Sequence, residues 1–120
     1  MKPILFVVAL ASLSSVAAAQ AVPVTLNEWK VQLTRDTVSA GAVTFRVKNE
    51  GSMLHQFQIE GQGLDKGTTQ IAAGQSASLT VTLKPGTYEV YCPMSDLSHK
   101  MAGMKRTITV VAAPTAPKKP

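Results

Sequence analysis

The 120-residue sequence has a single cysteine, two histidines and few aromatic residues, which make up 5% of the chain. One cysteine excludes an internal disulfide, so the stability of the protein has to come from its core or from a bound group. Charged residues make up 16% of the chain and form no cluster with aromatic side chains, which argues against nucleic-acid binding. The net charge of +5 is scattered, which is typical of a solvated surface. Such a charge would also help docking to an acidic partner or to a membrane surface.

Long apolar runs are also scarce. The first run covers residues 4–13, follows Lys2 and precedes small residues, which is the pattern of an export signal over residues 1–19 with cleavage after Ala19 or Ala21. It is shorter than the ~20 residues of a membrane span, so we expect a periplasmic or secreted protein with no stable membrane insertion. Residues 20–112 suffice for one domain, and the Pro- and Lys-rich residues 113–120 are predicted to form a disordered tail.

After the signal, apolar and polar residues alternate almost throughout, which predicts strands and argues against helices. Inward-facing rows are expected within residues 42–49, 55–60, 77–83, 87–92 and 105–111. Turn residues separate these rows, and the spacing predicts an all-β antiparallel sandwich or barrel. Residues 61–75, rich in Gly, Gln and Thr, are expected to be mostly loop.

The first strand is less regular. Val24 and Leu26 have one parity, whereas Trp29 and Val31 have the other. We therefore expect a bulge or a change of sheet between these two pairs.

The candidate functional residues are the only cysteine, both histidines and a nearby methionine: His55, Cys92, His99 and Met104. The alternation predicts that His55 and Cys92 face inward at the ends of their strands. His99 and Met104 lie in the loop that follows Cys92. A thiolate, two imidazoles and a thioether form the ligand set of a copper electron-transfer centre, because it suits both Cu(II) and Cu(I). Each residue alone is explained by packing or by a free thiol, but the combination favours copper binding.

The segment NEGSMLHQFQIEG around His55, and the Pro-Gly-Thr-Tyr lead into Tyr91-Cys92-Pro93, resemble those of the cupredoxins. These are small type 1 (blue) copper proteins that include plastocyanin, pseudoazurin and the azurins, and the resemblance spans roughly residues 22–112. It implies a Greek-key β-sandwich or barrel of about 7–8 short strands with the metal at one end. It also implies that His55, Cys92 and His99 are the equatorial ligands of one copper ion and that Met104 is the weak axial ligand.

One feature departs from the family pattern. Six residues separate Cys92 from His99, whereas familiar members usually have fewer. We expect the longer loop to contain a short helical turn capped by Ser95. Met94 and Met101 are alternative axial donors.

The function predicted is an exported carrier of single electrons that is not an enzyme, is a monomer and docks a transient redox partner near His99. The resemblance implies that this histidine passes the electron through an exposed edge. The alternative is an exported protein that buffers or delivers copper through soft sulfur donors at Met53, Met94, Met101 and Met104.

Two further classes are disfavoured, and two residues are expected to support the ligands. A multicopper or nitrite-reducing enzyme needs more histidines than this chain has. A hydrolase is disfavoured because no acidic residue is evident as an orienter for either histidine. Asn49 and Ser95 are candidates for hydrogen bonds that support the ligands.

Overall fold

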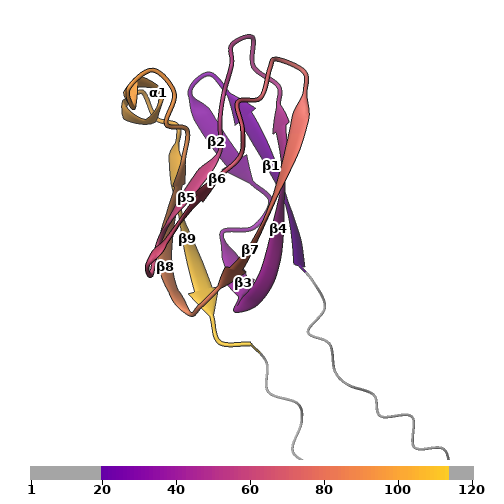
Figure 1. The fold of residues 1–120 in the computed structure, drawn as a ribbon, viewed down its shortest axis with the longest axis vertical. Helices are drawn as coiled ribbons and strands as arrows, with labels where there is room; N and C mark the ends of the chain where they lie inside the picture. The colour runs from indigo at the N-terminus through magenta and orange to yellow at the C-terminus, as the bar shows by residue number, and fades with distance from the viewer. Residues whose placement is uncertain (1–19, 114–120) are drawn as a thin grey trace, which may run out of the picture.

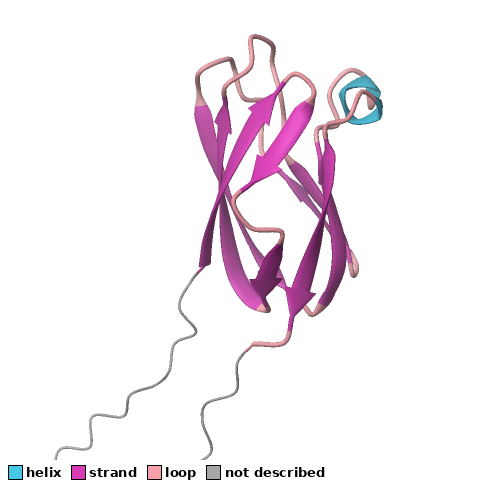
Figure 2. Cartoon of the chain, turned by 180° about the vertical axis from the view of Figure 1, so that it is seen from behind, coloured by secondary structure: helices cyan, strands magenta, loops and turns pink. Residues whose placement is uncertain are grey.

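Two β-sheets pack face to face, with one short helix at one end of the molecule (Figures 1 and 2). The structure is a computed structural model that describes residues 20–113, so the predicted signal and most of the predicted tail lie outside the described residues. The strand orders are β2-β1-β4-β7 and β3-β9-β8-β5-β6. Within residues 20–113, no helix has the length and apolar character needed to cross a membrane.

The bounds of the strands lie close to those of the segments predicted from the alternation of apolar and polar residues. The first sheet contains β1 (Gln20–Asn27), β2 (Lys30–Leu33), β4 (Gly41–Asn49) and β7 (Ser76–Leu83). The second sheet contains β3 (Thr37–Ser39), β5 (Gln58–Gly61), β6 (Leu64–Gly67), β8 (Gly86–Tyr91) and β9 (Lys105–Val111). Helix α1 (Ser98–Met101) lies between β8 and β9.

The predicted all-β sandwich is confirmed, with nine strands in the described residues where about 7–8 were expected. The sheets are mixed where the alternation predicted antiparallel pairing, because β1 runs parallel to β4 and β3 runs parallel to β9. Strand β6 lies in the segment predicted to be mostly loop. It forms a hairpin with β5, in which Gln58 is opposite Gly67.

The irregular segment after Val24 is a hairpin, so the predicted bulge or change of sheet there is wrong. Strands β1 and β2 pair antiparallel within one sheet, and residues 28–29 form the turn between them. Leu26 lies opposite Val31, so a chain reversal turns both side chains toward the core and explains the change of parity. The chain changes sheet only later, where β3 pairs with β9.

The core lies between the inner faces of the two sheets. Phe45 on β4 and Phe57 just before β5 are fully buried, and their ring centroids are 5.1 Å apart. Burying side chains of this size contributes about 1.5–3 kcal/mol each to the stability of the fold. The turn between β7 and β8 is closed by Tyr88, whose hydroxyl donates to the Lys84 carbonyl at 2.8 Å and accepts from the Lys84 amide at 2.9 Å.

The segments that carry the predicted site residues gather at one end of the sandwich. Helix α1, the β1–β2 turn and the β4–β5 loop all lie at the top of Figure 1. Strand β1 begins and strand β9 ends toward the opposite end. The site is therefore built from loops that a packed sandwich holds in place.

Candidate metal centre

Three of the four predicted site residues come together with their donor atoms facing one another. His55 Nδ1 lies 3.2 Å from His99 Nδ1, and Cys92 Sγ lies 3.9 Å from the first nitrogen and 3.7 Å from the second. His55 and Cys92 are fully buried, and His99 is 3% exposed. Their convergence joins the β4–β5 loop to the segment that follows β8.

The triangle of donor atoms fits a metal ion. A point in its plane lies about 2.1 Å from all three atoms, close to the bonds of about 2.0–2.3 Å that a metal such as zinc forms with imidazole nitrogen and thiolate sulfur. One thiolate and two imidazoles in a trigonal arrangement favour copper. The fit therefore agrees with the copper ion expected from the donor types.

Backbone pairing and a carboxylate hold His55 in place. Its backbone amide donates to the Ile71 carbonyl at 3.1 Å, and its carbonyl accepts from the Ile71 amide at 2.7 Å. His55 Nε2 lies 3.2 Å from Glu28 Oε1. An ionised carboxylate only accepts hydrogen bonds, so Nε2 carries the proton and Nδ1 offers its lone pair toward Cys92. The prediction that neither histidine has an acidic orienter is therefore wrong.

Glu28 is fixed in turn by the loop that carries His55. Its Oε1 accepts from the backbone amides of Ser52 at 2.7 Å and Met53 at 2.9 Å. The hydrogen bond from its own backbone amide, together with those from Met53, Ser52 and His55, lowers the pKa of Glu28 to about 2, and partial burial opposes this effect. The carboxylate is therefore ionised at neutral pH.

Asn49 holds the loop before His55 as a turn residue, and its side chain bonds to none of the three ligands, so the expected hydrogen bond to a ligand is not formed. Asn49 is fully buried. Its Oδ1 accepts from the Gly51 amide at 2.9 Å, and its Nδ2 donates to the carbonyls of Met53 and Ile71, each at 2.8 Å. These bonds close the loop that leads to His55.

Backbone hydrogen bonds connect the other predicted ligands. The Cys92 amide donates to the Met104 carbonyl, and the Met104 amide donates to the His99 carbonyl, both at 3.1 Å. Cys92 Sγ accepts from the Gln56 amide at 3.4 Å. Burial raises the pKa of the Cys92 thiol, and the amides of Gln56 and Met94 oppose this shift. Binding of a metal by this sulfur therefore releases a proton.

The longer loop contains the predicted helical turn, but the predicted cap is wrong. Helix α1 begins at Ser98, and no side chain caps it. Ser95, Asp96 and Leu97 have φ angles of 55°, 50° and 68°, in the left-handed region. This reversal of the chain accommodates the extra residues before His99. Ser95 contributes only its carbonyl, which accepts from the Ser98 amide at 3.0 Å.

Trp29 covers His99, and nothing in the sequence pattern marked it as part of the site. The two rings meet edge to face with centroids 5.0 Å apart. Trp29 is 41% exposed, whereas His99 is 3% exposed, so this histidine lacks the exposed edge that the resemblance implied. Burial lowers the pKa of His99, and the nearby His55 adds to this effect, which keeps the imidazole neutral and able to bind a metal.

The three candidate axial methionines differ in burial. Met104 is fully buried, Met94 is partly buried against the core, and Met101 is 83% exposed. Burial and backbone contact with both His99 and Cys92 favour Met104 among them.

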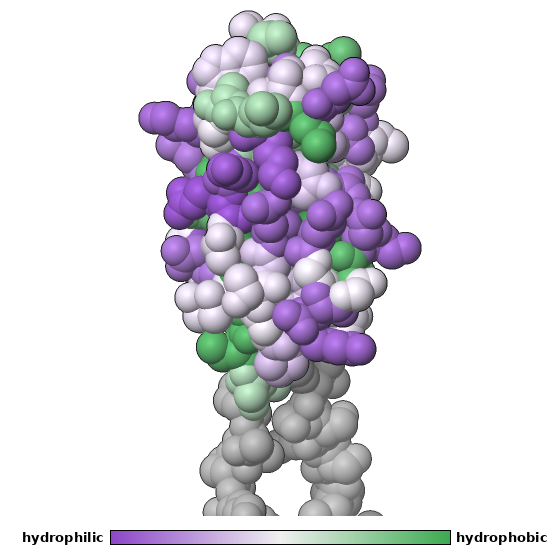
Figure 3. All heavy atoms as spheres, turned by 90° about the vertical axis from the view of Figure 1, so that its left-hand side faces the viewer, coloured by the Kyte–Doolittle hydropathy of each residue, from purple (hydrophilic) through white to green (hydrophobic). Residues whose placement is uncertain are grey.

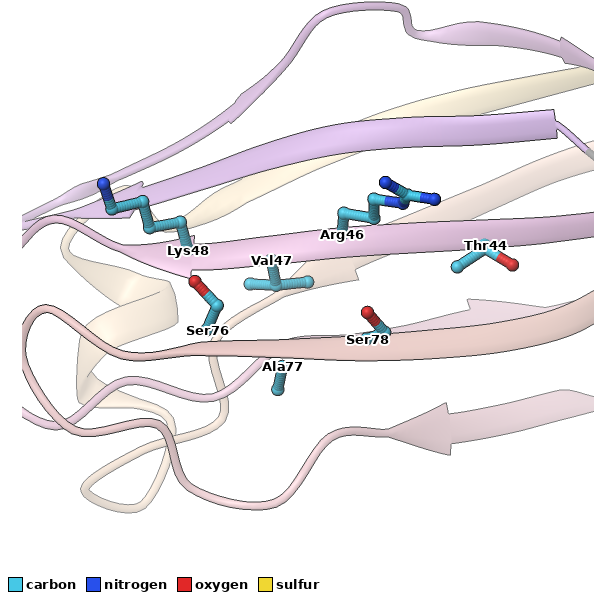
Figure 4. A pocket seen from close by; sticks show the side chains of 7 residues that line it. All are labelled: Thr44, Arg46, Val47, Lys48, Ser76, Ala77 and Ser78. Atoms are coloured by element: carbon cyan, nitrogen blue, oxygen red, sulfur yellow. The ribbon is translucent and has the colours of Figure 1, made fainter.

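A separate surface hollow of about 430 Å³ lies against β4 and β7 (Figure 4). Arg46 and Lys48 project from β4 and serine hydroxyls from β7, and the lining residues are Thr44, Arg46, Val47, Lys48, Ser76, Ala77 and Ser78. None of these side chains is a sulfur or imidazole donor. The hollow therefore has no part in the metal centre.

Comparisons with known proteins agree with this geometry. Among solved structures, the chain is similar to reduced auracyanin from the photosynthetic bacterium Roseiflexus castenholzii, with a TM-score of 0.64 and 19% identity over 78% of this chain and 98% of that one. It is also similar to auracyanin A, a "blue" copper protein from Chloroflexus aurantiacus, with a TM-score of 0.59 and 20% identity over 74% of this chain and 99% of that one. At these identities the likeness shows the fold.

Larger proteins contain the same fold. A multicopper oxidase matches with a TM-score of 0.60 and 18% identity, over 83% of this chain and 44% of that one. No curated protein shows significant similarity to the sequence. The profile of the cupredoxin-like domain family matches residues 2–110. The chain therefore belongs to the cupredoxin-like family, and His55, Cys92 and His99 are positioned to bind one copper ion.

Proposed function

We propose that this protein carries single electrons through one copper ion held by His55, Cys92 and His99, with Met104 as a weak fourth ligand. The observation that carries this proposal is the buried triangle of two imidazole nitrogens and one cysteine sulfur, 3.2–3.9 Å apart. When bound, copper supplies one-electron chemistry because this donor set suits both of its oxidation states. The side chains contribute a site that is already assembled, so little atomic movement accompanies electron transfer.

Trp29 and its apolar neighbours support the proposal that a redox partner docks transiently at this end. The large apolar side chains exposed here are Trp29, Met53, Leu54, Leu97 and Met101. Figure 3, which views the face on which α1 lies, shows apolar surface near the top and a band of hydrophilic side chains below it. A small apolar patch suits a weak, short-lived electron-transfer complex. We place the contact on Trp29, because that ring separates His99 from solvent.

We infer that the protein is exported and acts as a carrier that performs no catalysis of its own. Export is supported by the sequence of residues 1–19, which has the composition of a signal. The absence of catalysis is supported by the histidine count, because both histidines of the chain belong to the triangle. We expect a monomer in solution.

The test is the optical spectrum of the copper-loaded protein and of a Cys92→Ser variant. A thiolate bound to copper gives the intense visible absorption of blue copper proteins, so the wild-type protein is expected to be strongly coloured and the variant colourless. A Ser78→Ala variant changes an exposed hydroxyl on β7, outside the metal centre, and is the control, expected to keep the colour. Retention of the colour in Cys92→Ser refutes the ligand assignment.

A second candidate function is the buffering or delivery of copper. Met53 and Met101 are 43% and 83% exposed near the metal end, and thioether sulfur is a soft donor suited to Cu(I). Voltammetry separates the two functions. A stable, reversible wave supports the electron carrier, whereas rapid loss of copper to an acceptor protein without a reversible wave supports delivery.

A further inference from the structure

We propose that Glu28 is a positioning residue for the metal centre, whose carboxylate fixes the tautomer of His55 and lowers the reduction potential of the site. This inference rests on the proposed role of His55 as a copper ligand. It concerns a residue of the β1–β2 turn, in the first sheet, whereas the ligands lie on segments associated with the second sheet.

The first step is that hydrogen bonds hold the Glu28 carboxylate in one position. One oxygen, Glu28 Oε1, receives hydrogen bonds from the amides of Ser52 and Met53 as well as from His55 Nε2. A side chain on residue 51 would displace the carboxylate, because a Cβ on Gly51 would lie 2.5 Å from Glu28 Oε1 and 2.8 Å from Oε2. Glycine at position 51 therefore leaves room for the carboxylate.

The second step concerns the proton on His55. A neutral imidazole carries one proton on either nitrogen, and a carboxylate at Nε2 selects the tautomer with the proton there. The backbone bonds to Ile71 fix where the residue enters the site, and the bond to Glu28 fixes the ring. Nδ1 is then free to bind a metal from the side that faces Cys92 Sγ and His99 Nδ1. Without Glu28, no carboxylate selects the tautomer, and the ring is held only by packing and by the contacts of Nδ1 with His99 and Cys92.

The third step concerns charge. The oxidised ion carries two positive charges and the reduced ion one, and the Cys92 thiolate neutralises one charge in both states. A carboxylate one imidazole away attracts the oxidised ion more strongly, so it favours that state and lowers the reduction potential. The Glu28 side chain is 25% exposed, so solvent screens this effect only in part.

The neighbouring residue connects the same turn to the second imidazole. Trp29 packs edge to face against His99, while Glu28 bonds to His55. One two-residue turn from the first sheet therefore contacts both histidines. A change at Glu28 is expected to affect the site locally, with the nine strands unchanged.

The experiment compares Glu28→Gln and Glu28→Ala with Glu50→Gln. Glutamine keeps the shape and removes the charge, and alanine removes the acceptor as well. Glu50 is a matched control, because it is an exposed carboxylate of the β4–β5 loop that carries His55, and it pairs with Lys48, at 3.8 Å, and not with His55. Glu50→Gln changes the net charge of the protein by the same amount as Glu28→Gln.

Two measurements are made on each protein. In the metal-free protein, nitrogen NMR of His55 is expected to show the Nε2–H tautomer in wild type and Glu50→Gln, and a mixture of tautomers in Glu28→Ala. In the copper-loaded protein, voltammetry is expected to give a higher potential in both Glu28 variants than in Glu50→Gln. Copper affinity is expected to fall about 10–100-fold in Glu28→Ala.

The proposal is overturned if His55 keeps the Nε2–H tautomer in Glu28→Ala, or if the potentials of the Glu28 variants match that of Glu50→Gln. Gly51→Ala is a second route to the same result if Glu28→Ala does not fold, since its methyl group displaces the carboxylate. If the wild-type protein binds no copper, the proposed function fails. The tautomer measurement on the metal-free protein still decides whether Glu28 positions His55.

Discussion

The methionine sulfurs near the metal centre occupy very different surroundings. Met104 is fully buried beside Cys92 and His99, whereas Met101 lies two residues after His99 on α1 and is almost free in solvent. Only a sulfur held in place acts as a constant axial donor, and the axial donor tunes the potential of a site with two imidazoles and a thiolate.

Replacing Met104 with leucine is expected to change the visible spectrum and raise the potential. Leucine keeps the volume, so the metal-free protein should lose less than about 1.5 kcal/mol of stability. Met101→Leu is the control and should leave both properties as in wild type. The measurements are absorption and voltammetry on the loaded proteins and urea unfolding on the metal-free ones. A spectrum that changes in Met101→Leu and not in Met104→Leu would reverse the assignment.

At the scale of elements, α1 is held against the second sheet by Lys100. Its ammonium lies 4.3 Å from the centroid of the Tyr91 ring and forms an ion pair with Glu89 on the same strand. The hydroxyl of Tyr91 donates to Glu60 on β5. Tyr91 is therefore only 5% exposed, although its position on β8 turns it away from the core. These contacts fix the helix that carries His99.

Lys100→Ala is expected to loosen α1 without unfolding the sandwich. A partly exposed cation–π contact and an ion pair together contribute about 1 kcal/mol, so local opening should increase roughly fivefold. Hydrogen exchange of the Met101 and Ala102 amides, which bond within this helix, measures the opening. Lys100→Arg keeps the charge and should exchange almost as wild type. Equal exchange in Lys100→Ala and wild type would show that the contacts of Lys100 with Tyr91 and Glu89 do not hold the helix.

The elements also show what the sequence pattern could predict and what it could not. His55 and Cys92 were predicted to face inward because period-two alternation reports on which face of a strand a residue lies. Glu28 carries no such signal, because it lies in a turn and bonds to His55, 27 positions further along the chain, in the loop before β5. For a related reason, the sequence pattern predicts a bulge or a change of sheet where the structure has a hairpin after Asn27. A reversal and a bulge produce the same change of parity in sequence.

For the whole molecule, the sandwich, the position of the site at one end and the convergence of three candidate ligands could all be inferred before the structure. Alternation and turn residues predicted the sandwich, and donor chemistry predicted the ligand set, whereas the position of the site at one end followed from the resemblance to the cupredoxins. The parallel pairing of β1 with β4 and of β3 with β9 could not be inferred, because alternation is the same for both strand directions. The cover that Trp29 forms over His99 likewise depends on tertiary packing alone.

Removing copper is expected to lower the melting temperature of the whole domain. The chain has one cysteine and so no internal disulfide, which leaves the metal as the cross-link between the β4–β5 loop and the segment after β8. Free copper at 100 times its dissociation constant adds about 2.7 kcal/mol, which raises the melting temperature by roughly 10–20 °C. Calorimetry with and without copper measures the change. Cys92→Ser should respond little to copper, and a full response in that variant would contradict the cross-link.

The arrangement of the sandwich also determines how this protein can be mounted on a support. Strand β1 begins and β9 ends away from the metal centre (Figure 1). A gold surface or a fused enzyme attached next to either strand end would leave Trp29 facing the solution. Molecules tethered in this way should exchange electrons readily with dissolved proteins and slowly with the support, because the length of the sandwich separates the support from the ion.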